Sequence, residues 1–558
     1  MNLRTAISYL SRFKNRWDLL ALLSVLGAGL ALKLGLVFNS ETKKRKKRID
    51  EFLRKREEVK VSLQRCIAYT LNLKLYKDLP LLSLTQIRQM LDKGDVTVPE
   101  LVVVCAQRLK NEAWDRHLIS DVDLAGCLEQ AEILQHEINS GKVRSPLHGI
   151  PFSVHESIAC KGMIKRDMGQ TIVIDPQDSL LVSILKENGA IVLCKGAMSL
   201  WGEHPLIERP VNPQNKQRTI EGSSGPDAAM VKLGCVVAAI GSELIEGLRY
   251  ASMCCGVCAL RPTSSRISGK APGAKFGFPG LESSWGPIAK SSEDLSTIMD
   301  VLCRQRMHAL DPRIPPVVWK ECEPRKWKIG YIESDEFWPA PAPFQRVMKE
   351  VCQKLKSEGH TVVKVKFPPL IEALEHAAAM LFSNMKAFAG LSKFRKSMLM
   401  PKSLRNYYTI FQEKLHGEKE SFYAKVVRDK SAYSYSQHCM GATRFKEQVL
   451  EAWEDLDGVL LPYHCPAPYP GMQQDLFPGM IYTALAALID FPCANLVLGS
   501  INQEEQFYWE GKGKWVTVMN KCMENSEGLP LGIQVMCLPF REEQLLQIMQ
   551  TIENLFPK

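Results

Sequence analysis

The chain has 558 residues and a formal net charge of +10, and 46% of its residues are hydrophobic against 24% charged. This composition is typical of a globular protein and excludes a fibrous or largely disordered chain. Within residues 1–60, fifteen Lys or Arg face six Asp or Glu, so nine of the ten surplus charges belong to this segment. The remaining chain is almost neutral, and we therefore expect no nucleic acid as a partner.

Seventeen cysteines are scattered along the chain, often beside apolar residues. Their odd number and irregular spacing fit the reduced thiols of a cytosolic domain, where Cys packs as a small apolar side chain. Cys255 and Cys258 have the spacing of a redox or metal motif, but no second Cys or His pair stands at zinc spacing. We expect neither a metal site nor a cofactor.

Residues 19–38 form an apolar stretch that only Lys33 interrupts. At about 1.5 Å per residue, a helix of this length spans roughly 30 Å, the thickness of the hydrocarbon core of a bilayer. The stretch predicts a transmembrane helix, preceded at 1–18 by a short lumenal or extracellular N-terminus. A cleaved signal peptide is the competing interpretation, but the run is long and no clear cleavage site follows it.

A basic run, KKRKKR at 43–48, follows this stretch, and three more basic residues stand at 54–56. Only four basic residues precede the stretch. The positive-inside rule then places the bulk of the chain on the cytoplasmic side of a membrane, for which we expect an endomembrane such as the endoplasmic reticulum. Anionic lipid head groups can bind the same run. Residues 39–76 are expected to form a basic juxtamembrane segment and a connector helix.

From residue 77 onward, the pattern is that of an α/β domain. Residues 81–110 predict two helices with a turn at Gly94, and Pro99 lies in the first turn of the second helix. An apolar strand at 149–154, then a helix and a strand within 181–199, indicate the alternation of a largely parallel sheet. The same pattern returns in further short strands at 328–332, 359–365 and 458–462.

The segment from Glu221 to Thr263 contains two glycine-rich turns. Residues 222–225 read Gly-Ser-Ser-Gly, and residues 243–249 read Glu-Leu-Ile-Glu-Gly-Leu-Arg. The segment resembles the signature of the amidase signature hydrolases, in which the second turn reads Asp-Ile-Gly-Gly-Ser-Ile-Arg and carries a nucleophilic serine. The first turn of this chain keeps the family pattern, whereas the second is altered.

Other segments resemble the same family in the same order, among them LHGIPFSVHESIACKGM at 147–163 and SWGPIAKSSEDL at 284–295. The resemblance runs from about residue 75 to 556, and it is greatest to the membrane-bound fatty acid amide hydrolases. It implies one large mixed, mostly parallel sheet wrapped by helices, an α/β fold of amidase signature type over 77–558, in addition to the N-terminal transmembrane helix.

In that family, a buried neutral lysine deprotonates the serine nucleophile through a bridging serine, and main-chain N–H groups of the second turn bind the oxyanion. Carried over position by position, the base falls on His155, the bridging serine on Ser223 and the nucleophile on Gly247. The oxyanion-turn positions are Leu244, Ile245, Glu246 and Gly247. Of the three catalytic positions, only Ser223 keeps the family residue.

The three changes predict a loss of amidase chemistry. Gly247 has no side chain that can attack, and loss of the nucleophile from a serine-type triad costs about a million-fold in rate. His155 is shorter than lysine and has a different pKa, and Glu246 would repel an oxyanion. We expect Glu246 to pair with His155 or Arg249. The resemblance then implies a membrane-anchored pseudoenzyme of lipid metabolism that binds a fatty acyl amide or pairs, as a homodimer or heterodimer, with an active homologue.

An alternative interpretation keeps the protein an enzyme. His155 and Ser223 satisfy the pairing rule for an activated serine. They would make the chain a serine hydrolase of fatty acid amides or esters. In the family, however, the position of Ser223 faces the base rather than the substrate carbonyl. The nearby hydroxyls of Ser242 and Ser252 are expected to belong to turn or cap serines.

Overall fold

The computed structural model describes residues 46–65, 72–166, 172–200, 202–271, 280–304, 307–383, 422, 426, 431–510 and 513–556. The chain divides into two compact units, residues 1–58 and 59–558. Residues 46–65 are helical, within the predicted juxtamembrane and connector segment. The predicted transmembrane helix at 19–38 and the N-terminal segment at 1–18 lie outside the described residues. Among the described residues, no helix is both long enough and apolar enough to cross a bilayer.

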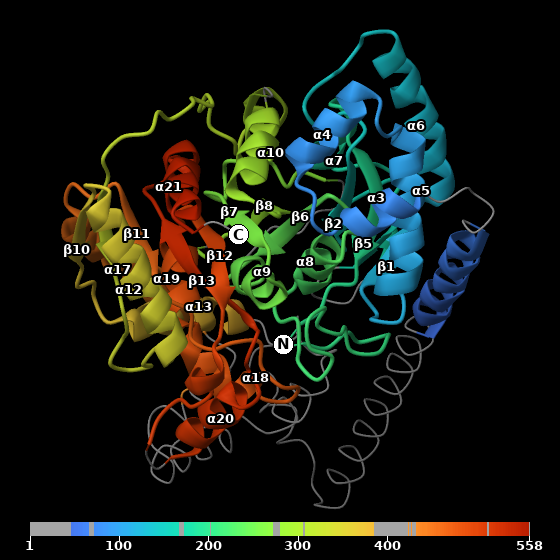
Figure 1. Ribbon diagram of the computed structural model, residues 1–558. Helices are drawn as coiled ribbons and strands as arrows, with labels where there is room; N and C mark the ends of the chain where they lie inside the picture. Colours follow the sequence, from blue (N-terminus) through green and yellow to red (C-terminus); the bar gives the residue numbers. More distant parts are fainter. Residues whose placement is uncertain are drawn as a thin grey trace, which may run out of the picture. The chain divides into compact units, whose positions relative to one another are not determined.

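One sheet of eleven strands runs through the second unit (Figure 1). Across the sheet its strands are, in order, β1 (Ile119–Val122), β5 (Ile191–Gly196), β2 (Pro151–His155), β6 (Ala238–Glu243), β8 (Ser284–Ala289), β7 (Cys258–Arg261), β12 (Cys493–Ser500), β13 (Pro530–Met536), β11 (Gly458–Leu461), β9 (Lys328–Tyr331) and β10 (Thr361–Lys364). A separate hairpin joins β3 (Ile164–Arg166) and β4 (Ile172–Ile174). The predicted large mixed sheet of an α/β fold is confirmed.

The prediction that this sheet is mostly parallel is wrong. Within the part of the sheet that the structure describes, four neighbouring pairs are parallel and six are antiparallel. Parallel pairing is confined to two groups of strands, β5-β2-β6 and β11-β9-β10, where helices connect the strands as βαβ units require. Between them, β8, β7, β12 and β13 pair only with antiparallel neighbours.

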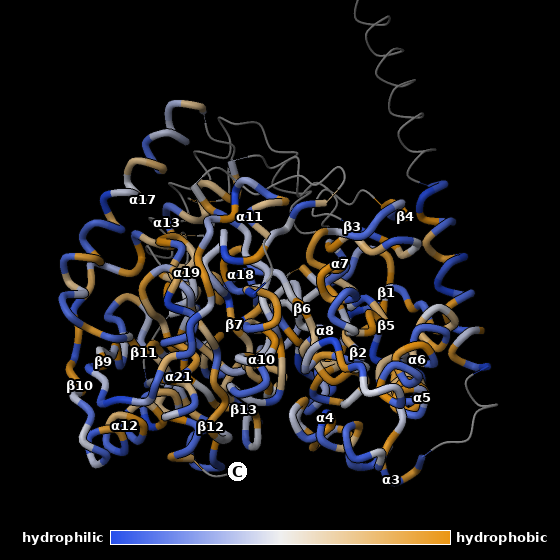
Figure 2. The backbone as a smooth tube through the Cα atoms, turned by 90° about the horizontal axis from the view of Figure 1, so that it is seen from above, coloured by the Kyte–Doolittle hydropathy of each residue, from blue (hydrophilic) through white to orange (hydrophobic). Residues whose placement is uncertain are grey.

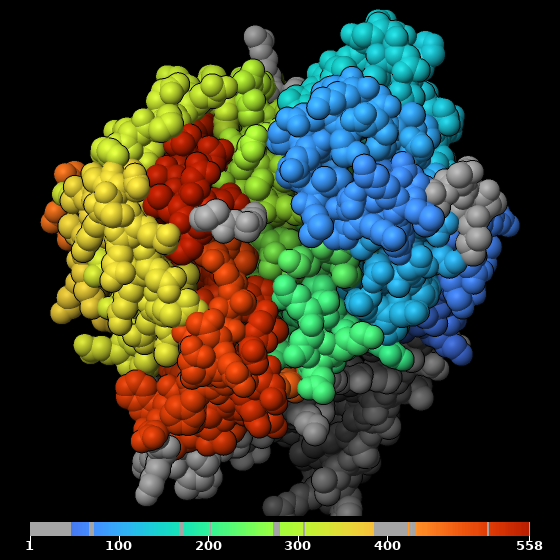
Figure 3. All heavy atoms as spheres, in the orientation of Figure 1, coloured from blue at the N-terminus to red at the C-terminus, as the bar shows by residue number. Residues whose placement is uncertain are grey.

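Helices surround the sheet. They are α3 (Leu73–Asp78), α4 (Leu84–Lys93), α5 (Val98–Arg108) with the π-helix η2 (Leu109–Ala113), α6 (Leu124–Asn139), α7 (Leu180–Glu187), α8 (Gly225–Lys232), α9 (Arg249–Cys255), α10 (Ser292–Arg304), α11 (Met307–Leu310), α12 (Ala342–Ser357), α13 (Leu370–Leu381), α17 (Ala432–Trp453), α18 (Gln473–Leu476) with the 3-10 helix η4 (Phe477–Met480), α19 (Ile481–Ile489), the 3-10 helix η5 (Gln503–Glu505), α20 (Lys514–Met523) and α21 (Glu542–Asn554). In the space-filling view, the blue and cyan part of the chain lies on one side of the visible face, and the yellow, orange and red parts lie on the other (Figure 3).

Local sequence signals explain where the first helices begin and end. Thr97 caps α5 in a capping box with Glu100, and Pro99 lies in its first turn. Gly94 ends α4 in the left-handed conformation, with φ of +74°. Both helices and the turn between them therefore agree with the prediction for residues 81–110.

Helix α12 illustrates how the helices pack on the sheet. Its buried residues recur every three or four positions, which gives the helix one apolar face, and they are Pro343, Phe344, Val347, Met348, Val351, Cys352 and Leu355. This face contacts the strands β13 and β10. Figure 2 shows the corresponding alternation of hydrophobic and hydrophilic residues along the helices. The helices thus bury apolar surface on the sheet and keep their charged residues in water.

A buried ion pair links the end of β6 to the start of α9. The side chains of Glu243 and Arg249 are both fully buried, and Arg249 Nε donates to Glu243 Oε1 at 2.7 Å. Glu243 Oε2 accepts from the main-chain N–H groups of Leu248 at 3.1 Å and Arg249 at 2.9 Å. Although burial alone would lower it, the pKa of Arg249 is raised above its usual value by the Glu243 carboxylate.

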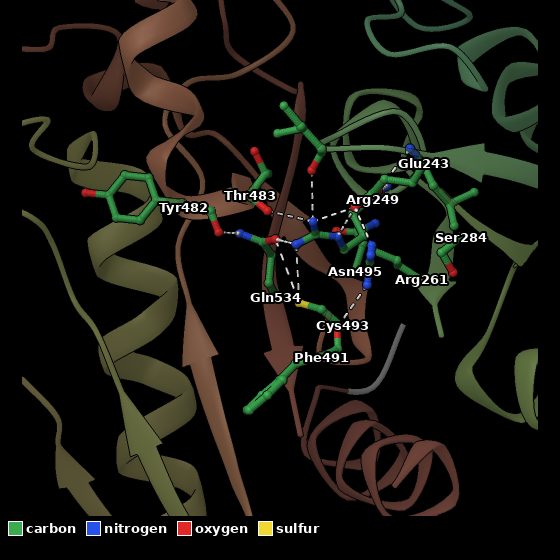
Figure 4. A network of polar contacts seen from close by, with 12 residues as sticks. Glu243, Arg249, Arg261, Ser284, Tyr482, Thr483, Phe491, Cys493, Asn495 and Gln534 are labelled. Atoms are coloured by element: carbon green, nitrogen blue, oxygen red, sulfur yellow. Dashed lines mark hydrogen bonds and ion pairs between the residues drawn. The ribbon is translucent and has the colours of Figure 1, made fainter. Parts of the chain in front are cut away.

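The same arginine connects three further parts of the chain (Figure 4). Its Nη2 donates to the carbonyl oxygens of Ile245 at 3.0 Å and Thr483 at 2.8 Å, and its Nη1 donates to the Gln534 side chain. Ile245 lies in the turn after β6, Thr483 in α19 and Gln534 in β13, and α9 itself packs on β7, β12 and β13. Arg249 therefore holds the second glycine-rich turn against the C-terminal half of the domain.

We expect Glu243→Gln to lower the free energy of unfolding by about 3–5 kcal/mol, because it leaves a buried guanidinium without its counter-charge. Urea unfolding of the full chain, followed by tryptophan fluorescence, measures the change. Arg304→Ala is the control: Arg304 pairs with Asp300 four residues earlier on the exposed face of α10. Because water screens such a pair, the unfolding midpoint should hardly move. Equal losses in the two variants would contradict the role given to Glu243.

Candidate functional site

The two glycine-rich turns lie side by side, although some twenty residues separate them in the sequence. The N–H group of Ser224 donates to the Gly247 carbonyl at 2.9 Å. The Ser224 hydroxyl accepts from the N–H group of Ser242 at 2.8 Å and donates to the Ser242 carbonyl at 3.0 Å. These bonds join the start of α8 to the end of β6. The structure therefore brings the predicted positions Ser223 and Gly247 together.

Gly222 shows how closely the turns approach. Its φ is +57°, a conformation that favours glycine. A Cβ atom at this position would lie 2.8 Å from Ala251 Cβ and 2.9 Å from the Gly247 carbonyl oxygen. Only glycine fits this contact, because the backbone of the second turn stands where a side chain would begin.

The space beside Gly247 is already filled. A Cβ atom built on Gly247 would lie 2.6 Å from Ser223 Oγ and 2.7 Å from the Ser242 carbonyl oxygen. The Ser223 hydroxyl donates to that same carbonyl at 3.1 Å. A side chain at Gly247 would therefore be crowded by the Ser223 hydroxyl, which is itself bound to the main chain.

The main-chain N–H groups of the predicted oxyanion turn find no acceptor among the residues that the structure describes. Within the described part of the chain, none of the four donates a hydrogen bond; they belong to Leu244, Ile245, Glu246 and Gly247. Leu244, Glu246 and Gly247 are half-buried rather than buried, so the turn keeps accessible surface. The donors that the family uses for an oxyanion therefore remain available to another acceptor.

His155 ends β2 and its side chain is buried. The ring nitrogen Nδ1 accepts from the main-chain N–H of Ser157 at 3.3 Å and lies 2.7 Å from the Ser157 hydroxyl. Because Nδ1 accepts from an N–H group, the proton of the neutral ring is assigned to Nε2. Nε2 itself has no hydrogen-bond partner among the described residues. His155 thus presents a donor, not a base, at its free nitrogen.

Burial also keeps this imidazole uncharged. It lowers the pKa of His155 to about 3, against a smaller raising effect of the neighbouring Glu156 carboxylate. Nor does any hydrogen bond join the His155 ring to the Ser223 hydroxyl in the described structure. The alternative dyad of His155 and Ser223 therefore lacks both the contact and the free lone pair that a general base needs.

The Glu246 carboxyl is not paired as expected. No hydrogen bond or ion pair joins it to His155 or Arg249 in the described structure, and its enclosed Oε2 atom has no partner. Arg249 is unavailable because it is saturated by Glu243 and by carbonyl oxygens. Burial raises the pKa of Glu246 well above its usual value, and the carboxylates of Glu221 and Glu243 raise it further.

A buried charged cluster lies next to His155, and sequence reasoning missed it. Glu156 forms an ion pair with Arg166 at 2.9 Å and accepts from the Met198 N–H at 2.9 Å. Lys195, on the adjacent strand β5, is fully buried and donates from Nζ to the Ile158 carbonyl at 2.5 Å. Burial lowers the pKa of Lys195. The available signal was a single lysine inside an otherwise apolar strand.

Asp227 belongs to the same buried region. Its Oδ1 accepts from the Ser153 hydroxyl at 2.8 Å, and burial raises the pKa of this carboxyl to about 7. A Cβ atom on Gly196 would lie within about 2.5 Å of the Asp227 carboxyl, so only glycine fits opposite His155 in the register of β2 and β5. The first glycine-rich turn is thereby fixed to the strand that carries His155.

We expect His155 to make the protein sensitive to acid. Its folded-state pKa, about 3, lies below the ordinary value of 6.5. Between these pH values the imidazole binds a proton in the unfolded chain but not in the folded chain. Above pH 6.5 the ring is neutral in both states, and its titration does not change the free energy of unfolding. Below pH 6.5 the free energy of unfolding falls by about 1.4 kcal/mol per pH unit as the pH drops toward 3. Urea unfolding at a series of pH values measures this slope.

His155→Asn should flatten the slope, because an amide oxygen can replace Nδ1 as the acceptor from Ser157 and does not titrate. His464 is also buried with a pKa lowered to about 3, so His464→Asn is the matched second variant and should flatten the slope by a similar amount. An unchanged pH profile in His155→Asn would show that the imidazole is protonated in the folded protein.

Comparison with known proteins places this geometry in a family. The family model described as Amidase matches residues 100–546. Fatty-acid amide hydrolase 1 of Sus scrofa is 28% identical over 445 residues, covering 73% of this chain and 76% of that protein. Fatty acid amide hydrolase 1 of Caenorhabditis elegans is 26% identical over 520 residues, covering 85% of this chain and 88% of that protein.

Solved structures show the same fold. A fatty acid amide hydrolase superposes with a TM-score of 0.73 at 20% identity, covering 92% of this chain and 96% of that one. A 6-aminohexanoate cyclic dimer hydrolase superposes with a TM-score of 0.67 at 17% identity, covering 86% and 98%. The sheet and its helices are thus shared with these hydrolases.

Proposed function

This chain belongs to the amidase family, and we propose that it is a fatty-acid-amide-hydrolase-like pseudoenzyme, a protein that binds lipid amides without cleaving them. The observation that carries the proposal is the geometry at Gly247. The position of the family nucleophile has no side chain, and Ser223 Oγ and the Ser242 carbonyl stand where one would begin.

The chemistry of amide cleavage supports this proposal. An amide is a poor electrophile with a poor leaving group, so the reaction needs an activated nucleophile and a proton relay to the departing nitrogen. In this chain the Ser223 hydroxyl donates to the Ser242 carbonyl, and His155 offers a protonated nitrogen. Neither group is arranged to start the reaction or to pass a proton on.

The proposed ligand is a fatty acyl amide, in keeping with the names of the relatives, and the free N–H groups of the second turn are its binding donors. In this proposal, the apolar stretch at 19–38 anchors the chain in a membrane as a single-pass helix, with the domain on the cytoplasmic side. Pairing with an active homologue, or with a second copy, is a further mode of action of such a protein.

A fluorophosphonate probe, which reacts covalently with activated serines, tests whether the protein is inactive. We expect no labelling of the full-length chain above the level of the heat-denatured chain, because Ser223 is not activated by a base. Labelling that disappears in Ser223→Ala would overturn the proposal and support the serine hydrolase that uses His155 and Ser223. Labelling that persists in Ser223→Ala would reveal a nucleophile elsewhere and would overturn it as well.

Adding a side chain at Gly247 tests how tightly the second glycine-rich turn is packed. Gly247→Ser alone should lower the free energy of unfolding by about 1–3 kcal/mol, since its Cβ atom meets the Ser242 main chain, which cannot rotate away. Gly247→Ala is the matched control and should cost a similar amount, because it adds the same Cβ atom. If the free energy of unfolding falls in neither variant, the turn can move to accommodate a side chain.

We expect Gly247→Ser combined with His155→Lys to restore measurable hydrolysis of a long-chain acyl amide, and adding Glu246→Gly to increase it by removing the carboxyl beside the oxyanion donors. Release of ammonia from oleamide is the measurement, with the Gly247→Ala and His155→Lys double variant as the control. Continued inactivity of the triple variant would show that the protein has diverged from the hydrolases beyond these three side chains.

A further inference from the structure

We propose that Glu246 and the free N–H groups of the second glycine-rich turn recognise the intact, neutral amide group of a fatty acyl amide and reject the carboxylate of a free fatty acid. This inference rests on the proposed lipid-amide binding and adds its specificity. Glu246 is the specificity-determining residue, and the rejected carboxylate is the group that hydrolysis of the amide would produce.

The donors at the site recognise a carbonyl oxygen. The four N–H groups of residues 244–247 have no acceptor in the described structure. A ligand oxygen that reaches this half-buried turn can accept hydrogen bonds from these donors. Both an amide and a carboxylate present such an oxygen, and the donors alone do not tell them apart.

The charges around the turn separate the two ligands. Besides burial, three charged groups act on the Glu246 carboxyl. The carboxylates of Glu221 and Glu243 repel a negative charge there, and Arg249 attracts one. Arg249 is already paired with Glu243, and the His155 ring is neutral. A carboxylate placed beside Glu246 would lose its water next to two other carboxylates, and Arg249, already paired with Glu243, would compensate little of that cost.

The Glu246 carboxyl completes the selection. Its enclosed Oε2 atom has no partner in the described structure. In the ionised form, Glu246 accepts a hydrogen bond from an amide N–H and repels a carboxylate. In the neutral form, it donates to the amide carbonyl and accepts from the amide N–H, a pair of complementary bonds that a carboxylate cannot make because it has no N–H. The ionised form therefore rejects a carboxylate by repulsion, and in the neutral form only the amide satisfies both the donor and the acceptor of the Glu246 carboxyl.

Equilibrium binding of radiolabelled oleamide and oleate to the full-length protein in nanodiscs tests the proposal. For the native chain we expect oleamide to bind about tenfold or more tightly than oleate. Glu246→Gln keeps the size of the side chain but cannot become negative, so oleate should bind more tightly and the ratio should fall to about threefold or less. Glu504→Gln, an exposed glutamate of η5, is the matched control and should leave the ratio unchanged.

Each outcome bears on a different claim. Binding of neither lipid would overturn the proposed lipid-amide binding itself. Equal binding of the two lipids by the native chain would leave that function standing and overturn the selectivity. A preference for oleamide that persists in Glu246→Gln would show that another group sets the specificity and would overturn the role of Glu246. Circular dichroism of each variant establishes that it is folded.

Discussion

The buried pair of Glu243 and Arg249 is the contact on which the geometry of the site depends. Helix α9 has only seven residues, and the side chain of Leu248, at its N-cap, cannot cap it. The Glu243 carboxylate performs this task from the end of β6, while Arg249 binds the carbonyl of Ile245 inside the turn. The turn is therefore shaped by residues that take no part in amide chemistry. A scaffold held in this way keeps its form when the reactive side chains are exchanged.

The sequence predicted what local signals determine and missed what long-range pairing determines. The caps of α4 and α5, and the two glycine-rich turns, follow from residues within a few positions of one another. The antiparallel centre of the sheet does not, because β7 and β12 pair across more than two hundred residues. At the site, the assignment of His155, Glu246 and Gly247 to replaced positions remains a prediction from the resemblance. That Ser157 binds the His155 ring, and that Arg249 prefers Glu243 to Glu246, depends on side-chain directions that spacing does not encode.

The proposed loss of chemistry rests on the positions of atoms as well as on residue types. A glycine at the nucleophile position removes the attacking oxygen, and the neighbouring Ser223 hydroxyl then lies beside the vacated Cβ position. A histidine at the base position turns its lone pair toward Ser157. Meanwhile the N–H groups of the turn stay unpaired in the described structure. In the proposed function, such a site can hold a carbonyl oxygen without breaking the bond beside it.

The position of Arg249 in the chain has a consequence for biosynthesis. Its partners Thr483 and Gln534 lie 234 and 285 residues further along the sequence, and β12 and β13, which complete the centre of the sheet, are the last strands to be made. A ribosome adds about 5–20 residues per second, so the guanidinium waits for many seconds before its acceptors emerge. During this time the first half of the sheet exposes an unfinished edge at β7. An open strand edge is a template for pairing with another chain, so β7 is exposed to misassembly until β12 has been translated.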